Sequence, residues 1–175
     1  MTELDFTILA IIARDGPLSA YDVRKVFAQS LTPTWSSSTG SIYPSIGRLE
    51  KMDMVTASAP QGGRSRKLVS ATAEGKRRLS AWLADIDAST ASATPDAIRT
   101  RMFFLALASA ADRRDIISAA VRSTEIALST AEQTRLARPP SQGTDWARYA
   151  SMGVIYQLRA RLDWLRWLAQ ESGIH

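Results

Sequence analysis

The 175-residue sequence contains no cysteine, and its only histidine is the last residue, His175. Without cysteine the chain forms no disulfide and offers no thiolate to a metal ion or a substrate. A histidine at a chain terminus is rarely held in a fixed geometry. The sequence also lacks a glycine-rich phosphate loop before a helix and a cluster of metal ligands. We therefore expect a protein that is not an enzyme and that needs no metal ion or other cofactor.

Long apolar runs are also missing. No stretch approaches the roughly 18 apolar residues that suggest a transmembrane helix, and the N-terminus lacks the basic segment of a signal peptide. We expect a cytoplasmic protein with no membrane partner. The alternative is a membrane-surface helix over residues 159–168, which are rich in arginine and tryptophan. Asp163 and Glu171 interrupt the basic face of that helix, so this interpretation is the weaker one.

The charge of the chain is concentrated in one segment. The whole sequence carries 22 Lys and Arg against 17 Asp and Glu, a net charge of +5. Residues 20–78 hold ten basic and four acidic side chains, so this segment alone carries +6 and the remainder carries −1. An excess of positive charge suits a polyanionic partner such as nucleic acid. The alternative, which charge alone leaves open, is a solvated basic surface.

Helix signals are regular in the first 50 residues. Thr2 and Ser19 each precede an amphipathic segment and are followed by a carboxylate three residues later, which predicts two capped helices. We expect a third helix to begin near Ser41, preceded by a turn through Gly40. That start places Pro44 in the first turn, where the missing N–H needs no intrahelical acceptor.

A β-hairpin is predicted after the third helix. Residues 55–59 and 66–70 are short β-compatible runs around a glycine-rich basic loop, and Thr72 can cap a fourth helix. Three helices followed by a hairpin are the order of a winged helix-turn-helix, whose third helix enters the DNA major groove. We expect this DNA-binding domain to span residues 1–87.

The second half of the chain is predicted to be entirely helical. Residues 88–94 are small and polar, as in a linker, and Thr94-Pro95-Asp96 is a helix start with Thr94 as the cap. Helices are expected at about 96–109, 112–137 and 145–171. The predicted fold class is therefore mainly α: an N-terminal winged helix-turn-helix of three helices and a two-stranded β-wing, then an all-α domain over residues 95–175.

The residues expected to contact DNA lie on the second helix, the third helix and the hairpin. Small hydroxyl side chains and free N–H groups at a helix start suit phosphate and base edges, and cations on a glycine-flanked tip suit phosphate. The alternative for Arg48 is an ion pair with a carboxylate such as Glu50 or Asp53. The candidates are Tyr21, Arg24, Lys25, Ser38, Thr39, Gly40, Ser41, Tyr43, Pro44, Arg48, Lys51, Gly63, Arg64, Arg66 and Lys67.

Three segments resemble the PadR family of bacterial transcriptional regulators. Residues 16–23 resemble the opening of that family's second helix, residues 38–50 its recognition-helix signature, and residues 63–75 its wing and the following helix start. The resemblance implies a DNA-binding regulator. The sequence departs from the family at Asp53, which stands where a glycine usually takes a left-handed turn.

The C-terminal half is similar to the helical extension of longer PadR-like proteins, the virulence-activator α domain, at residues 98–105 and 162–168. In that family such helices form the dimer interface, and tryptophan is a favoured interface anchor. The alternative is an intramolecular helical core. The residues expected at a dimer interface are Phe103, Phe104, Ile155, Leu158, Leu162, Trp164, Leu165, Trp167 and Leu168.

Some PadR-like proteins respond to small aromatic molecules, which implies a possible effector as a further partner. Trp35, Trp82 and Trp146, with Phe103 and Phe104, are candidates to line such a site, although aromatic residues at helical spacing more often belong to a core. Together, these observations predict a sequence-specific DNA-binding regulator, by family habit a repressor. It is expected to bind double-stranded DNA at a pseudo-palindromic operator as a homodimer.

Overall fold

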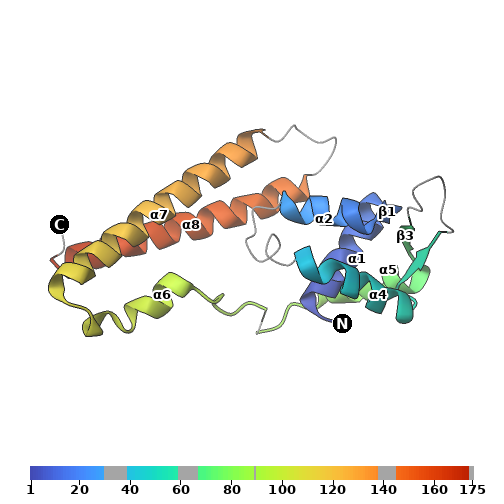
Figure 1. Cartoon of the computed structure of the whole chain (residues 1–175), viewed down its shortest axis with the longest axis horizontal. Coiled ribbons are helices and arrows are strands. Elements are labelled where there is room, and N and C mark those ends of the chain that lie inside the picture. Colours follow the sequence, from blue (N-terminus) through green and yellow to red (C-terminus); the bar gives the residue numbers. More distant parts are fainter. Residues whose placement is uncertain (30–38, 59–66, 89, 138–144, 174–175) are drawn as a thin grey trace. The chain divides into compact units, whose positions relative to one another are not determined.

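A computed structural model describes residues 1–29, 39–58, 67–88, 90–137 and 145–173 (Figure 1). The chain divides into two compact units, Met1–Ser92 (unit 1) and Ala93–His175 (unit 2). The boundary falls inside the segment 88–94 that the composition marks as a linker. Each unit is described by itself.

The two predicted helix caps at the start of unit 1 are confirmed. In α1 (Glu3–Asp15) the Thr2 hydroxyl accepts from the Asp5 N–H at 3.2 Å, and the Asp5 carboxylate accepts from the Thr2 N–H at 2.9 Å. Ser19 and Asp22 make the same reciprocal pair at the start of α2 (Ala20–Ala28). Each pair satisfies N–H groups that a helix start leaves without an intrahelical acceptor.

The third helix of the predicted order begins where the sequence indicates. A short 3₁₀ turn, η1 (Thr39–Ser41), leads into α4 (Ile42–Lys51), so Pro44 lies in the first turn. After α4, Asp53 has a φ of 57°, which confirms that this aspartate takes the left-handed turn. The turn directs the chain from α4 into the sheet.

The sheet has three antiparallel strands rather than the predicted two. β1 (Leu18–Ser19) and β2 (Val55–Ala57) pair with opposite edges of β3 (Leu68–Ala71). The register joins Leu18 to Val69 and Val55 to Ala71. A strand of two residues between two helices is too short to show an alternating pattern, and this explains why the sequence does not reveal β1.

The core of unit 1 is closed by α5 (Ala73–Ala84), which Thr72 caps as predicted by accepting from the Gly75 N–H at 2.9 Å. Apolar side chains from α1, α2, α4 and the sheet fill the space between these elements. The fully or almost fully buried members are Ile8, Leu9, Ile11, Ile12, Val23, Phe27, Ile42, Ile46, Leu49, Met54, Val55 and Val69.

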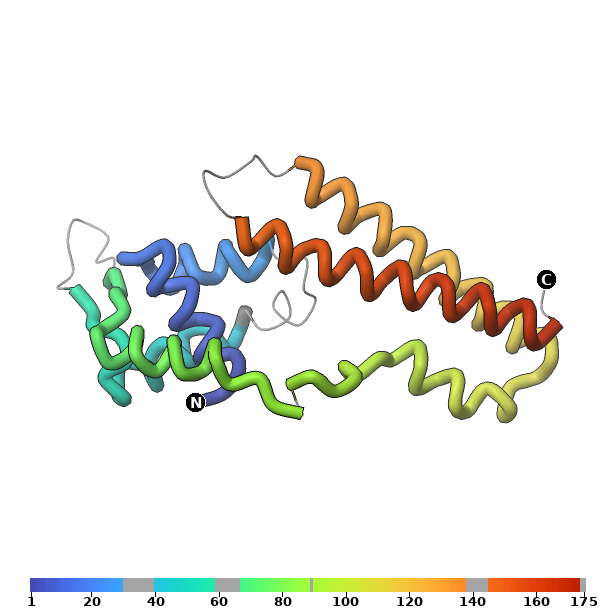
Figure 2. Tube along the Cα trace, turned by 180° about the vertical axis from the view of Figure 1, so that it is seen from behind, coloured from blue at the N-terminus to red at the C-terminus, as the bar shows by residue number. Residues whose placement is uncertain are grey.

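Unit 2 is helical, with α6 (Ala97–Met102), the turn η2 (Leu105–Leu107), α7 (Ala110–Ala137) and α8 (Trp146–Glu171). The long helices α7 and α8 lie side by side in both views (Figures 1 and 2). The first helix ends at Met102, well short of the predicted residue 109. Among the described helices, none has the length and apolar character that crossing a bilayer requires.

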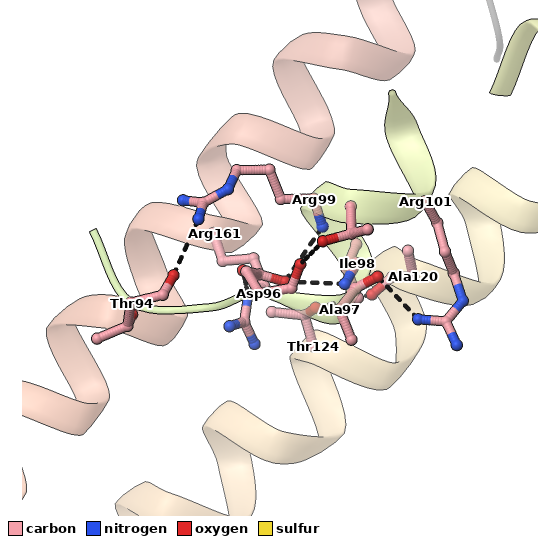
Figure 3. Close-up of polar contacts among 10 residues, drawn as sticks. Thr94, Asp96, Ala97, Ile98, Arg99, Arg101, Ala120, Thr124 and Arg161 are labelled. Carbon is pink, nitrogen blue, oxygen red and sulfur yellow. Dashed lines mark hydrogen bonds and ion pairs between the residues drawn. The ribbon is translucent and has the colours of Figure 1, made fainter. Parts of the chain in front are cut away.

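The cap of α6 corrects another prediction. Asp96, not Thr94, is the N-cap: one carboxylate oxygen accepts from the N–H groups of Ile98 at 2.9 Å and Arg99 at 3.1 Å (Figure 3). The other oxygen accepts from Arg161 Nε of α8 at 2.7 Å. A carboxylate serves all three donors, which a threonine hydroxyl cannot. Burial acts to raise the pKa of Asp96, but these hydrogen bonds and the Arg161 charge outweigh it and lower the pKa.

Candidate DNA-binding surface

The helix α4 has one buried and one exposed face. Ile42, Ser45, Ile46 and Leu49 are buried in unit 1. At 100° per residue, the opposite side forms a continuous stripe that starts in η1 and runs the length of the helix. Tyr43 is 61% exposed on this stripe. A core tyrosine would be buried, so Tyr43 does not belong to the core of unit 1. The stripe, called the α4 stripe below, consists of Gly40, Tyr43, Pro44, Gly47 and Lys51.

The α4 stripe contains four of the predicted DNA contacts and one residue that was not predicted, Gly47. Ser41, another predicted contact, occupies the N-cap of α4, but its side chain makes no capping hydrogen bond. On α2, the predicted contacts Tyr21, Arg24 and Lys25 are also exposed.

Other predicted contacts lie outside the described residues: Ser38, Gly63, Arg64 and Arg66. Thr39 begins η1.

Arg48 forms an ion pair within the chain. Its Nη2 donates to Asp5 Oδ1 and to Ser45 Oγ, both at 2.7 Å. The partner is therefore on α1, not the nearby Glu50 or Asp53 that local spacing suggests. The Arg48 side chain remains 48% exposed, whereas that of Asp5 is 2% exposed. This ion pair fixes α4 against the start of α1.

The environment of Asp5 keeps its carboxylate charged. Burial acts to raise its pKa, but hydrogen bonds from the Thr2 backbone, from Arg48 and from the hydroxyls of Thr2 and Ser45 together lower it. A carboxyl whose pKa is lower in the folded protein stabilises the fold above its unfolded pKa of about 3.9. That stabilisation is lost as the pH falls through the folded pKa.

Replacing Asp5 with asparagine is expected to lower the free energy of unfolding by about 1–2 kcal/mol at pH 7, because Arg48 loses a charged partner but stays half in solvent. The difference from the wild type should shrink below about pH 4. Urea unfolding followed by circular dichroism at pH 7 and pH 3 measures both. The matched control is Asp15→Asn, which removes an exposed pair with Arg14 and should cost less than about 0.5 kcal/mol. Equal effects of the two variants would contradict the assignment.

Lys67 makes a second tie to α4. Its Nζ lies 2.8 Å from Glu50 Oε1 and 2.9 Å from Glu50 Oε2, and its side chain is 56% exposed. The pair joins the start of β3 to the end of α4. Two of the cations expected at DNA, Arg48 and Lys67, therefore hold α4 in place from opposite sides.

The residues predicted at a dimer interface separate into two groups. Ile155, Leu162 and Leu165 are at most 6% exposed within the single chain, in which α7, with its own buried residues, lies along α8 (Figures 1 and 2). Their burial thus matches the intramolecular alternative. Leu158, Trp164 and Leu168 are partly buried, whereas Phe103, Phe104 and Trp167 are 78%, 62% and 54% exposed.

A second face of α8 was not singled out from the sequence. Seven residues follow one another at alternating spacings of three and four, which is the heptad period of a coiled-coil seam. All seven are exposed in the single chain. Trp146 and Tyr149, at one end, meet edge to face with ring centres 5.9 Å apart. This face, called the α8 seam below, consists of Trp146, Tyr149, Gly153, Tyr156, Ala160, Asp163 and Trp167.

The tryptophans proposed to line an effector site have different environments. Trp82, in unit 1, stacks on Phe6 with ring centres 5.2 Å apart and planes 5° from parallel, and its Nε1 donates to Glu3 at 3.3 Å. These contacts attach α5 to α1 and account for Trp82 structurally. Trp146, in unit 2, is 75% exposed. Trp35 lies outside the described residues.

Comparison with known sequences identifies the domain type of unit 1. Residues 8–81 match the transcriptional regulator PadR-like family. The negative transcriptional regulator PadR of Bacillus subtilis (strain 168) is 33% identical over 85 residues, which are 47% of this chain and 46% of that protein. The match thus spans about half the length of that relative.

Solved structures extend the likeness of fold to almost the whole chain. Bacillus subtilis PadR in complex with operator DNA aligns with a TM-score of 0.81 at 21% identity, covering 97% of this chain and 99% of that one. The same protein with p-coumaric acid aligns at 0.76 and 22%, covering 95% and 94%. The Vibrio cholerae virulence activator AphA aligns at 0.71 and 18%, covering 99% and 100%. The predicted winged helix fold with a helical C-terminal region is therefore confirmed.

Proposed function

We propose, from the premise that this chain carries a PadR-like transcriptional regulator domain, that it represses transcription by binding an operator as a homodimer. The observation that carries the proposal is the α4 stripe. It combines an exposed tyrosine, a lysine and open backbone on the helix that follows α2 in the helix-turn-helix order. A helix presented in this way reads base edges in the major groove.

The ion pairs of Arg48 and Lys67 support this role indirectly. A recognition helix discriminates between sequences only when its side chains are held in one register against the duplex. Asp5, through Arg48, and Lys67, through Glu50, hold α4 from two sides, so little ordering of the helix remains to be done on binding. Lys51 supplies a phosphate contact, and Tyr43 lies in the first turn of α4, near the N-terminal end of the helix, which enters the groove first.

The α8 seam supports the homodimer. A parallel pairing of two copies would place Asp163 against Asp163 and each bulky aromatic against itself. An antiparallel pairing in coiled-coil register instead places Gly153 opposite Tyr156 of the second copy, and Ala160 opposite its Tyr149. Large side chains then meet small ones, as close packing requires. The homodimer proposed here is therefore antiparallel along α8.

A two-fold dimer presents two copies of α4 to one duplex. Half-sites on one face of the DNA are separated by about one helical turn, roughly 34 Å. The operator should accordingly be a pseudo-palindrome.

Variants of the α4 stripe test the DNA-binding role. Tyr43→Ala should weaken operator binding at least tenfold and binding to random DNA much less, because a base contact carries sequence information. Lys51→Ala should weaken binding to both DNAs alike and reduce the salt slope by about one unit, because a phosphate contact does not. Fluorescence anisotropy with the promoter fragment upstream of the gene, at several salt concentrations, measures both.

The stability of these variants provides the control. Tyr43 and Lys51 are exposed, so their urea midpoints should remain near that of the wild type. A Tyr43→Ala variant that unfolds more easily, or that keeps its preference for the operator, would argue against a groove contact.

A second candidate function is that of an effector-responsive regulator. The observation in its favour is the fold shared with a PadR structure containing p-coumaric acid, together with the exposed aromatic side chains of unit 2. A phenolic acid that binds unit 2 should quench tryptophan fluorescence saturably and release the operator. The absence of quenching at millimolar concentrations would count against the effector role while leaving DNA binding intact.

A further inference from the structure

Gly47 lies in the interior of α4, where glycine is the least favourable ordinary residue. An interior glycine costs about 1 kcal/mol relative to alanine. Packing within the chain does not require it, because a Cβ at Gly47 would meet no atom within 4 Å. At Gly75, by contrast, a Cβ would lie 2.1 Å from the Met54 carbonyl oxygen. The fold thus explains Gly75 but not Gly47.

The surface beside Gly47 is hollowed. The hollow lies between α2, α4 and β3, and its apolar lining comes from Ala20, Ile46 and Val69, with Tyr43, Glu50 and Lys67 around it. Gly47 borders this hollow and also belongs to the α4 stripe, one turn from both Tyr43 and Lys51. The missing side chain therefore leaves an indentation in the middle of the α4 stripe.

We propose that Gly47 is the position at which duplex DNA approaches the backbone of α4 most closely. This inference rests on the proposed function and identifies a further positioning residue for it. The major groove is about 12 Å wide, and a helix with its side chains is about 10–12 Å across. The clearance is small, so one residue without a side chain determines how deeply the helix enters.

The helix has little freedom to withdraw from a clash. Arg48 ties it to Asp5 at 2.7 Å, and Glu50 ties it to Lys67 at 2.8 Å. A side chain added at Gly47 is therefore not relieved by a shift of α4, and the added volume is transferred to the DNA contact.

Two substitutions test the proposal, Gly47→Ala and Gly47→Leu. Both residues favour helix more than glycine, so both variants should unfold at a urea midpoint equal to or above that of the wild type. The operator dissociation constant should rise about tenfold for alanine and at least tenfold more for leucine. Ser80→Ala and Ser80→Leu are the matched controls, because Ser80 is an exposed interior residue of α5 in the same unit. They should leave binding unchanged.

Three results would overturn the inference: operator affinity unchanged in Gly47→Ala, a loss that does not grow from alanine to leucine, or a lower urea midpoint in Gly47→Ala. The second would indicate an effect of helix stiffness rather than of volume. The wild-type measurement separates this inference from the proposed function. If the wild type binds no fragment of its own promoter region better than random DNA, the proposed function fails; if it binds and only the Gly47 series departs from expectation, the inference alone fails.

Discussion

Replacing Gly75 with alanine is expected to lower the free energy of unfolding of unit 1 by about 3 kcal/mol, the upper range for overpacking a closed site. The added Cβ would lie 2.1 Å from the carbonyl oxygen of Met54 and 3.0 Å from its carbonyl carbon. The obstacle is backbone, so no side-chain rotation removes the clash. Either α5 or the backbone at Met54 must therefore move.

Met54 is poorly placed to move. Its carbonyl oxygen accepts from the Thr72 N–H at 3.0 Å, and the Thr72 hydroxyl donates to the Asp53 carbonyl oxygen at 2.7 Å, with that of Met54 3.1 Å away. The same hydroxyl caps α5 by accepting from Gly75 N–H. On the other side, Asp53 already takes a left-handed conformation. A shift of Met54 would disturb the turn after α4, the cap of α5 and the contact between them at once.

Urea unfolding followed by circular dichroism measures this loss. Gly47→Ala is the matched control, because it is the same chemical change on a helix of the same unit with open space around the new atom. The two variants should change stability in opposite directions. A Gly75→Ala protein as stable as the wild type would show that α5 does not depend on its close approach to Met54.

Features set by neighbouring residues could be predicted from the sequence. The caps at Thr2, Ser19 and Thr72 and the start of α4 after Ser41 each depend on a few consecutive side chains. Their energetics are local, so composition and spacing carry the information.

Features set by distant residues could not be predicted in this way. Arg48 is 43 positions from Asp5, and Arg161 is 65 positions from Asp96. Several carboxylates were available to each arginine, and only the packing of α1 on α4, or of α6 on α8, selects the partner. The same holds for β1, which exists because β3 presents an unpaired edge to Leu18 and Ser19.

The two faces of α8 differ in how clearly the sequence marks them. The strongest apolar periodicity on α8 runs through Ile155, Leu162 and Leu165. From the sequence, this face is predicted to pack against a second chain. In the structure, these residues are buried within the single chain, where α7 lies along α8 (Figure 1). The α8 seam contains tyrosine, glycine, alanine and aspartate among its tryptophans, so it does not stand out as an apolar stripe, and its heptad spacing is the informative signal.

The α8 seam leads to the prediction with the largest expected effect on function. Tyr156→Glu should weaken the homodimer about 100-fold or more, because an unpaired carboxylate in a closed interface loses its hydration. Sedimentation equilibrium measures the change. Tyr156 is 63% exposed in the single chain, so unit 2 should retain its helix content. Gln133→Glu, which adds the same charge to an exposed position of α7, and Tyr156→Phe should both leave the dimer intact.

Loss of the dimer should also weaken operator binding by a factor of about 100 or more, because the second half-site is then no longer bound at a high effective concentration. The residual affinity should equal that of the wild type for a single half-site, since α4 itself is unchanged. A Tyr156→Glu protein that remains dimeric would move the interface away from the α8 seam. A monomeric variant with full operator affinity would instead show that one copy of α4 is enough to read the site, which would overturn the pseudo-palindrome.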